Sequence, residues 1–117
     1  MESQPCRFML RELPELLERA RGALASFVKA DRENLVFLPN ATAGVNTVLA
    51  SFPFRPGDRL LTTSHDYFAC HNALMVNAER RGAVVDTVSI PFPLSSEEEI
   101  VEGVLSAVTP KTRLALL

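Results

Sequence analysis

The sequence lacks the features that mark several classes of protein. No apolar run approaches the roughly 20 residues that a membrane-spanning helix requires. The net charge is −2 and the basic residues are scattered, so no positive patch for nucleic acid is expected. The only two cysteines, Cys6 and Cys70, lack the spacing of a metal-ligand motif. The sequence therefore favours a protein without disulfides, without a metal site, and with neither nucleic acid nor membrane as a partner.

The start of the chain also lacks a targeting signal. Residues 1–10 have no charged start and no long apolar centre, as a secretory signal would have. We therefore expect a cytoplasmic protein. At 117 residues with 47% hydrophobic residues, the chain has the size and composition of one globular domain with a buried core.

What the sequence contains is an alternation of helix and strand patterns. Apolar residues at helical spacing predict a helix over residues 10–27, with a fresh start at Pro14. Further helices are predicted from residue 45 onward, over residues 67–81, and behind a capping box made by Ser95 and Glu98. Short apolar runs predict strands at residues 35–38, 59–63, 83–90 and 113–117. Repeated strand–helix units with buried strands predict an α/β fold, a parallel sheet with helices on both faces.

Residues 37–46 contain the segment of most chemical interest. A predicted buried strand leads through the small and polar residues 40–44 onto the beginning of a helix. The free N–H groups and the dipole of a helix N-terminus bind anions, and Thr42 adds a hydroxyl donor. The same pattern also fits a simple capped helix with Asn40 or Thr42 as its N-cap. The spacing by itself favours the capped helix.

Several motifs in order resemble one enzyme family. Residues 39–46, PNATAGVN, look like the phosphate-binding turn of class V aminotransferases, in the branch similar to isopenicillin N epimerase. The resemblance continues through residues 54–58, 61–67 and 109–114, and upstream through residues 7–8 and 11–13. It implies that residues 1–117 form part of the large cofactor-binding domain of a fold-type-I pyridoxal 5'-phosphate (PLP) enzyme. On this basis we expect an incomplete domain, truncated at the C-terminus and also at the N-terminus.

The resemblance implies a cofactor and three residues that bind it. Ala41 and Thr42 would contact the PLP phosphate, and Tyr67 would stack on the pyridine ring. Cysteine desulfurases carry a histidine where this chain has Tyr67, which argues against that branch. The substrate would be an amino acid, and the outcome an epimerase, lyase or aminotransferase reaction. The full-length protein would be a homodimer.

The catalytic residues of the family are absent. Lys29 and Lys111 are the only lysines, and neither matches the family's lysine that forms the Schiff base with PLP. The acid that pairs with the pyridine nitrogen and the arginine that binds the substrate carboxylate would also lie after residue 117. No catalytic residue is therefore assigned. We expect the strands at 59–63 and 83–90 to be neighbours, and those at 35–38 and 113–117 to have later partners. A chain with such strands would be marginally stable or prone to aggregate.

Other interpretations remain open. The chain could bind a different phosphate ligand such as a nucleotide, although it has no glycine-rich nucleotide motif. It could also be a short interaction module or a pseudoenzyme without activity. His65, His71 and Cys70 lack the spacing of a metal site or a catalytic dyad, and we interpret them as ordinary polar residues and a small buried thiol.

Overall fold

The computed structural model describes residues 4–117, and these divide into two compact units, Met1–Leu38 and Pro39–Leu117. Residues 1–3, on which part of the signal-peptide prediction depends, lie outside the described residues. Among residues 4–117, no helix combines the length and the apolar character that crossing a membrane demands.

The first unit is helical. It contains α1 (Pro5–Arg7), the π-helical turn η1 (Phe8–Glu12), α2 (Leu13–Val28) and the 3₁₀ turn η2 (Arg32–Asn34). Pro14 lies in the first turn of α2, as predicted, but the helix makes no fresh start there, because the chain is already helical from Pro5 through the π turn. The helix ends at Lys29, whose φ of 55° is left-handed. This is the usual way to end a helix, although glycine is the residue that adopts it most easily.

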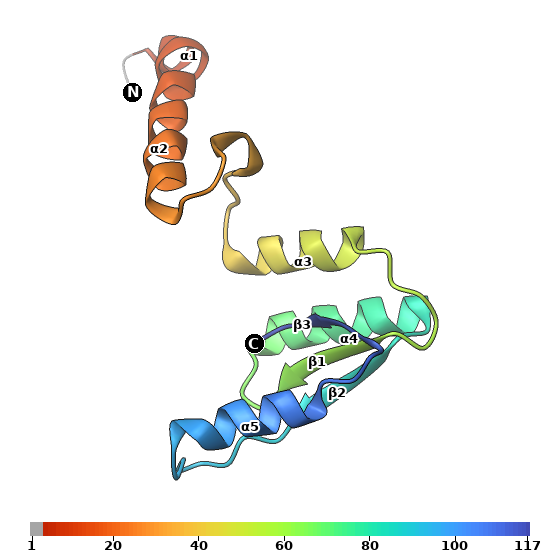
Figure 1. Ribbon diagram of the computed structural model, residues 1–117. Coiled ribbons are helices and arrows are strands. Elements are labelled where there is room, and N and C mark those ends of the chain that lie inside the picture. Colours follow the sequence, from red (N-terminus) through yellow and green to blue (C-terminus); the bar gives the residue numbers. More distant parts are fainter. Residues whose placement is uncertain (1–3) are drawn as a thin grey trace. The chain divides into compact units, whose positions relative to one another are not determined.

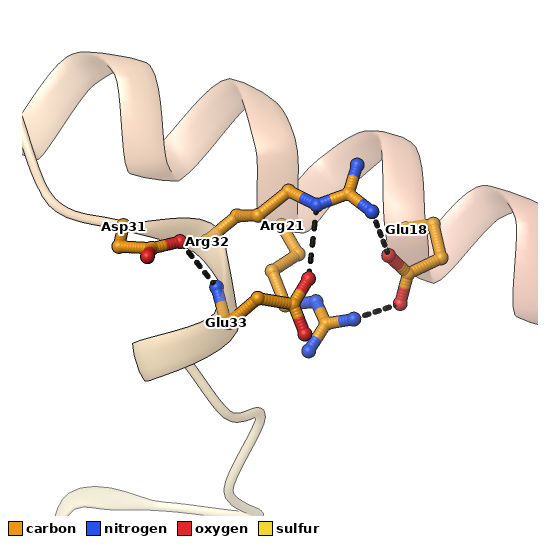
Figure 2. Close-up of polar contacts among 5 residues, drawn as sticks. All are labelled: Glu18, Arg21, Asp31, Arg32 and Glu33. Carbon is orange, nitrogen blue, oxygen red and sulfur yellow. Dashed lines mark hydrogen bonds and ion pairs between the residues drawn. The ribbon is translucent and has the colours of Figure 1, made fainter.

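Figure 2 shows the polar contacts that join η2 to α2. Glu18 forms ion pairs with Arg21 one turn along α2 and with Arg32, whose Nη2 lies 3.8 Å from Glu18 Oε2. Arg32 Nε also lies 3.1 Å from Glu33 Oε1, and Asp31 Oδ1 accepts the Glu33 N–H at 3.0 Å. Glu18 and Arg32 are about half exposed, so the network orients the turn and contributes little stability.

The prediction of a buried strand at residues 35–38 is wrong for this structure. These residues form no strand, and Val36, Phe37 and Leu38 are 76%, 53% and 47% exposed. A strand requires a neighbouring strand to satisfy its N–H and C=O groups. The sheet of the structure lies wholly within the second unit, so within residues 4–117 this apolar segment has no strand beside it.

The second unit has the predicted α/β architecture. In chain order it contains α3 (Ala41–Ser51), β1 (Arg59–Thr63), α4 (Phe68–Arg81), β2 (Val84–Val88), α5 (Glu97–Ala107) and β3 (Thr112–Ala115). The strands form a parallel sheet in the order β2-β1-β3. The expected pairing of β1 with β2 is confirmed. The expectation that the last strand has only later partners is wrong, because β3 pairs with β1 and leaves one of its own edges open.

Both faces of the central strand are covered. Leu60 and Leu61 point to opposite faces of the sheet, and both are fully buried. Figure 1 shows α3 and α4 on one face and α5 on the other. The core on the first face joins both helices to the sheet and consists of Leu49, Phe54, Leu60, Leu74 and Ala78. On the other face, Gly103 of α5 lies against Val88 of β2, with 3.5 Å from an added Cβ to Val88 Cγ1.

The ends of the helices follow the predicted signals with one correction. Gly82 ends α4 with a φ of 67°, as predicted. The capping box is shifted by one residue from the predicted pair, Ser95 and Glu98. Ser96 caps α5 by accepting the Glu99 N–H, and Glu99 Oε2 accepts the Ser95 N–H at 3.1 Å. Adjacent serines and three consecutive glutamates allow both registers, and sequence spacing cannot distinguish between them.

Candidate functional site

The first part of the candidate site is the N-terminus of α3. Asn40 is the N-cap, and its Oδ1 accepts the Ala43 N–H at 2.8 Å. The Asn40 alternative for the N-cap is therefore confirmed. The helix starts at Ala41, so the predicted helix start at residue 45 is wrong and the small residues 41–44 are its first turn. The helix can begin this early because the Asn40 side chain accepts one of the N–H groups that have no partner inside the helix.

This arrangement leaves donors for an anion. The first N–H groups of a helix have no partner inside the helix. Asn40 Oδ1 accepts the N–H of Ala43. The N–H groups of Ala41 and Thr42 precede it, at the positive end of the helix dipole. Thr42 adds a hydroxyl, and the Ala41 methyl group leaves room close to the backbone. Two N–H groups and a hydroxyl are a donor set that suits a phosphate group.

The second part of the site is Tyr67, the residue before α4. Tyr67 is the N-cap of α4 and has an extended backbone with φ −65° and ψ 123°. Its carbonyl accepts the N–H groups of Cys70 and His71, each at 2.9 Å. The side chain is 68% exposed, so the ring is free to contact a ligand. The backbone of Tyr67 is thus held by the helix while its ring faces solvent.

The fold brings these two parts to the same end of the second unit. Figure 1 shows that α3, α4 and α5 begin where β1, β2 and β3 end. Because α3 packs against α4, the helix start with Ala41 and Thr42 and the helix start with Tyr67 lie on neighbouring elements. The carboxyl end of a parallel sheet is where α/β proteins bind ligands.

Next to Tyr67 lies a polar pocket that the sequence analysis did not identify. It has a volume of about 350 Å³, and its lining comes from the ends of β1 and β2 and the start of α4: Thr63, Ser64, Asp66, Phe68, His71 and Thr87. Asp66 Oδ2 accepts the hydroxyl of the fully buried Thr62 at 3.0 Å. The signal that could have revealed it is a carboxylate in the short turn after a buried strand, three residues beyond the end of β1.

The two lysines lie in different units. Lys29 lies in the first unit, and Lys111 precedes β3, at the beginning of the strands. There its carbonyl accepts the Arg59 N–H at 2.9 Å. Arg59 in turn forms a two-pronged ion pair with Asp86, with 2.6 Å from Nε to Oδ2. The pKa of Arg59 is raised, first by the hydrogen bond with Asp86 and then by its charge. Arg59 and Lys111 therefore lie at the end of the sheet away from the helix starts, and Asp86 lies in the middle of β2.

The histidines and cysteines form no metal cluster among residues 4–117. His71 Nδ1 lies 3.9 Å from Asp66 Oδ2, a loose contact at the edge of the polar pocket. Cys70 is buried in α4, which confirms the interpretation of a small buried thiol, and Cys6 is exposed.

Comparison with known proteins identifies the family. Residues 9–117 match the family described as Aminotransferase class-V. The chain belongs to this family. Over 97% of its length it is 36% identical to isopenicillin N epimerase of Amycolatopsis lactamdurans and 32% identical to that of Streptomyces clavuligerus. It is also 28% identical, over 82% of its length, to hercynylcysteine sulfoxide lyase of Schizosaccharomyces pombe, of which it covers 24%. The chain spans 29% of the length of the two epimerases.

Solved structures confirm the fold. The cystine C-S lyase C-DES, in complex with its product cysteine persulfide, superposes with a TM-score of 0.80 at 23% identity. The match covers 90% of this chain and 27% of C-DES. The cysteine desulfurase CsdA of Escherichia coli gives a TM-score of 0.71 at 21% identity, with the same coverage. A mutant of C-DES with glycine covalently linked to its PLP cofactor gives 0.75. The α/β sheet of this chain is therefore the sheet of part of these larger proteins.

Proposed function

We propose that this chain provides the phosphate turn and the ring platform of a PLP-dependent enzyme that acts on an amino acid. The observation that carries the proposal is the start of α3, where Asn40 caps the helix and leaves the Ala41 and Thr42 donors for a phosphate. Family membership and the PLP in the C-DES structure support it. When bound, PLP acts as an electron sink that stabilises negative charge on the amino acid's Cα.

Each residue of the chain has a limited task in this proposal. Ala41 and Thr42 hold the phosphate through N–H groups and a hydroxyl. The exposed ring of Tyr67 covers one face of the pyridine ring, orients it and excludes water from that side. Within the second unit, Lys111 lies at the end of the sheet away from the helix starts, so these residues would hold the cofactor through non-covalent contacts. The lysine, the substrate-binding arginine and a homodimer partner would come from outside the chain.

The relatives leave the reaction open within one class of chemistry. They include epimerases, a sulfoxide lyase and cysteine desulfhydrases. The lyase and desulfhydrase names describe changes to cysteine or a cysteine derivative. The outcome depends on the side chains that contact the substrate, and none of these is assigned in this chain. We therefore propose the substrate class, an amino acid, without choosing the outcome.

The test is PLP binding, measured by the change in cofactor absorbance. It uses the 117-residue chain and the longest polypeptide that the gene encodes. Thr42→Ala removes one hydrogen bond to a charged group, worth about 1.5–3 kcal/mol, and should weaken binding by roughly tenfold or more. Thr42→Ser keeps the hydroxyl and serves as the control. Tyr67→Phe keeps a stacking ring and should bind nearly as wild type, whereas Tyr67→Ala should bind more weakly.

The absence of PLP binding would contradict this proposal. If neither polypeptide binds PLP at millimolar cofactor, the phosphate turn is only a capped helix. The pseudoenzyme or interaction-module interpretation would then take its place.

A further inference from the structure

Asp66 occupies an unusual place in the turn between β1 and α4. Its side chain is only 10% exposed, although it carries a carboxylate and lies in a short loop. Buried carboxylates are costly unless they are hydrogen-bonded. Here Oδ2 accepts the Thr62 hydroxyl at 3.0 Å, and Thr62 is 0% exposed in the central strand of the sheet. The carboxylate is therefore attached to the buried central strand of the sheet.

The same residue also connects to the other side of the turn. The Asp66 N–H donates to the Thr63 carbonyl at 3.3 Å, which closes the turn at the end of β1. His71 Nδ1, in the first turn of α4, lies 3.9 Å from the Oδ2 that Thr62 contacts. The His71 N–H donates to the Tyr67 carbonyl at 2.9 Å. Asp66 thus links the last residues of β1 to the first turn of α4, and Tyr67 lies between them.

We propose that Asp66, anchored by the Thr62 hydroxyl, is the positioning residue that holds the Tyr67 ring in place at the carboxyl end of the sheet. The proposal rests on the proposed function, in which Tyr67 is the platform for the PLP ring. A ring that is 68% exposed has few packing contacts of its own to set its position. Its direction must then come from the backbone beneath it, and Asp66 and the start of α4 supply that support.

The chain offers a direct probe of this arrangement without any cofactor. Tyr67 is the only tyrosine, and the sequence has no tryptophan. The near-ultraviolet circular dichroism of tyrosine and the quenching of its fluorescence by acrylamide therefore report on Tyr67 alone. Both are measured on the 117-residue chain, with far-ultraviolet circular dichroism to follow the overall fold.

Two substitutions break the anchor from opposite sides. Thr62→Val removes the donor hydroxyl at nearly constant volume, and Asp66→Ala removes the acceptor. Both should weaken the dichroism of Tyr67 and make its fluorescence easier to quench. Asp66→Asn keeps an oxygen that can accept the Thr62 hydroxyl, so it should restore most of both signals. Thr87→Val, which removes an exposed hydroxyl from the same pocket, should leave both unchanged.

Cofactor binding separates this proposal from the proposed function. If the wild type binds PLP, Asp66→Ala should weaken binding about three- to tenfold, the effect of one lost hydrogen bond. That loss should disappear in a Tyr67→Ala background, since the two changes act through the same ring. A wild type that binds no PLP overturns the proposed function, while the cofactor-free signals still decide whether Asp66 holds Tyr67.

The positioning role is overturned if Thr62→Val and Asp66→Ala leave both Tyr67 signals as in the wild type. It is also overturned if Asp66→Ala weakens PLP binding equally with and without the Tyr67 ring. Should Asp66→Ala lose its far-ultraviolet signal, Thr62→Val and Asp66→Asn decide the question.

Discussion

The guanidinium of Arg81 donates a hydrogen bond to the carbonyl of Ala50, with 3.1 Å between Nη2 and the oxygen. A second bond from Nη1 reaches the Phe52 carbonyl at 3.3 Å. Ala50 lies in the last turn of α3, where carbonyl groups have no partner inside the helix. A cation at that place also complements the negative end of the helix dipole. Arg81, at the end of α4, therefore holds together the ends of the two helices whose beginnings form the candidate site.

Removing this contact should loosen the second unit. Arg81→Met keeps the alkyl chain but loses both hydrogen bonds, and we expect a loss of about 1 kcal/mol in the free energy of unfolding. Arg81→Lys should recover only part of it, because an ammonium group lacks the planar fork. The measurement is urea denaturation followed by circular dichroism. Arg80→Met makes the same change of charge one residue away, and equal losses for the two variants would rule out a specific role for Arg81.

The left-handed backbone at Gly82 predicts a cost for any side chain there. Gly82→Ala places a Cβ at a φ of 67° and 3.4 Å from Pro56 Cβ. The backbone conformation alone should cost about 1–2 kcal/mol. The loss is measured as a lower midpoint in urea or in thermal unfolding.

Gly103→Ala is the matched control for Gly82→Ala. Gly103 lies inside α5, and an added Cβ there would meet Val88 Cγ1 at an ordinary 3.5 Å. Alanine is the better helix former, so this variant should gain about 0.5–1 kcal/mol. A destabilised Gly103→Ala, or a neutral Gly82→Ala, would contradict the backbone geometry at that position.

The start of α5 predicts a pH effect. The pKa of Glu98 is lowered, first by a hydrogen bond with its own backbone N–H and then by the Ser96 hydroxyl. A lowered pKa in the folded state stabilises the fold above the ordinary pKa of a glutamate. That contribution is lost as the pH falls through the lowered pKa. Ser96→Ala should therefore raise the pKa of Glu98 toward its ordinary value, as followed by NMR titration of the side-chain carboxyl carbon.

The same substitution should also weaken the helix at neutral pH. Ser96 accepts the Glu99 N–H, and removing an N-cap serine costs about 1 kcal/mol. Ser106→Ala removes a hydroxyl from the last turn of the same helix and should leave the titration of Glu98 unchanged. A pKa of Glu98 that does not respond to Ser96→Ala would show that the hydroxyl is not its partner.

The isolated 117-residue chain is expected to be marginally stable and to associate as its concentration rises, so the unfolding and Tyr67 measurements are made at low concentration. Large apolar side chains are exposed in many segments of the chain, among them Val36 at 76%, Leu105 at 65% and Leu117 at 74%. The outer edges of β2 and β3 present unpaired backbone groups, which favour pairing with other chains. Size-exclusion chromatography with light scattering, and binding of a dye specific for exposed apolar surface, would detect this. A chain that stays monomeric at high concentration and unfolds only in concentrated urea would contradict the expectation.

The sequence predicted correctly those features that depend on residues close together in the chain. Pro14 at the start of α2, Gly82 at the end of α4 and the alternation of apolar strands with amphipathic helices were all predicted and are present. Each depends on one residue's backbone preference or on a short hydrophobic period. The capping box was displaced by one residue because Ser95 and Ser96 offer the same chemistry.

Long-range pairing decided the remaining features. The apolar residues 35–38 have the composition of a buried strand, but composition cannot supply a neighbouring strand. The pairing of β3 with β1 likewise depends on how distant segments meet in space. The sequence by itself determined the α/β class, the family resemblance and Ala41, Thr42 and Tyr67 as candidate residues. Only the tertiary structure decided that the two helix starts share one end of the sheet, because that requires parallel strands and packed helices.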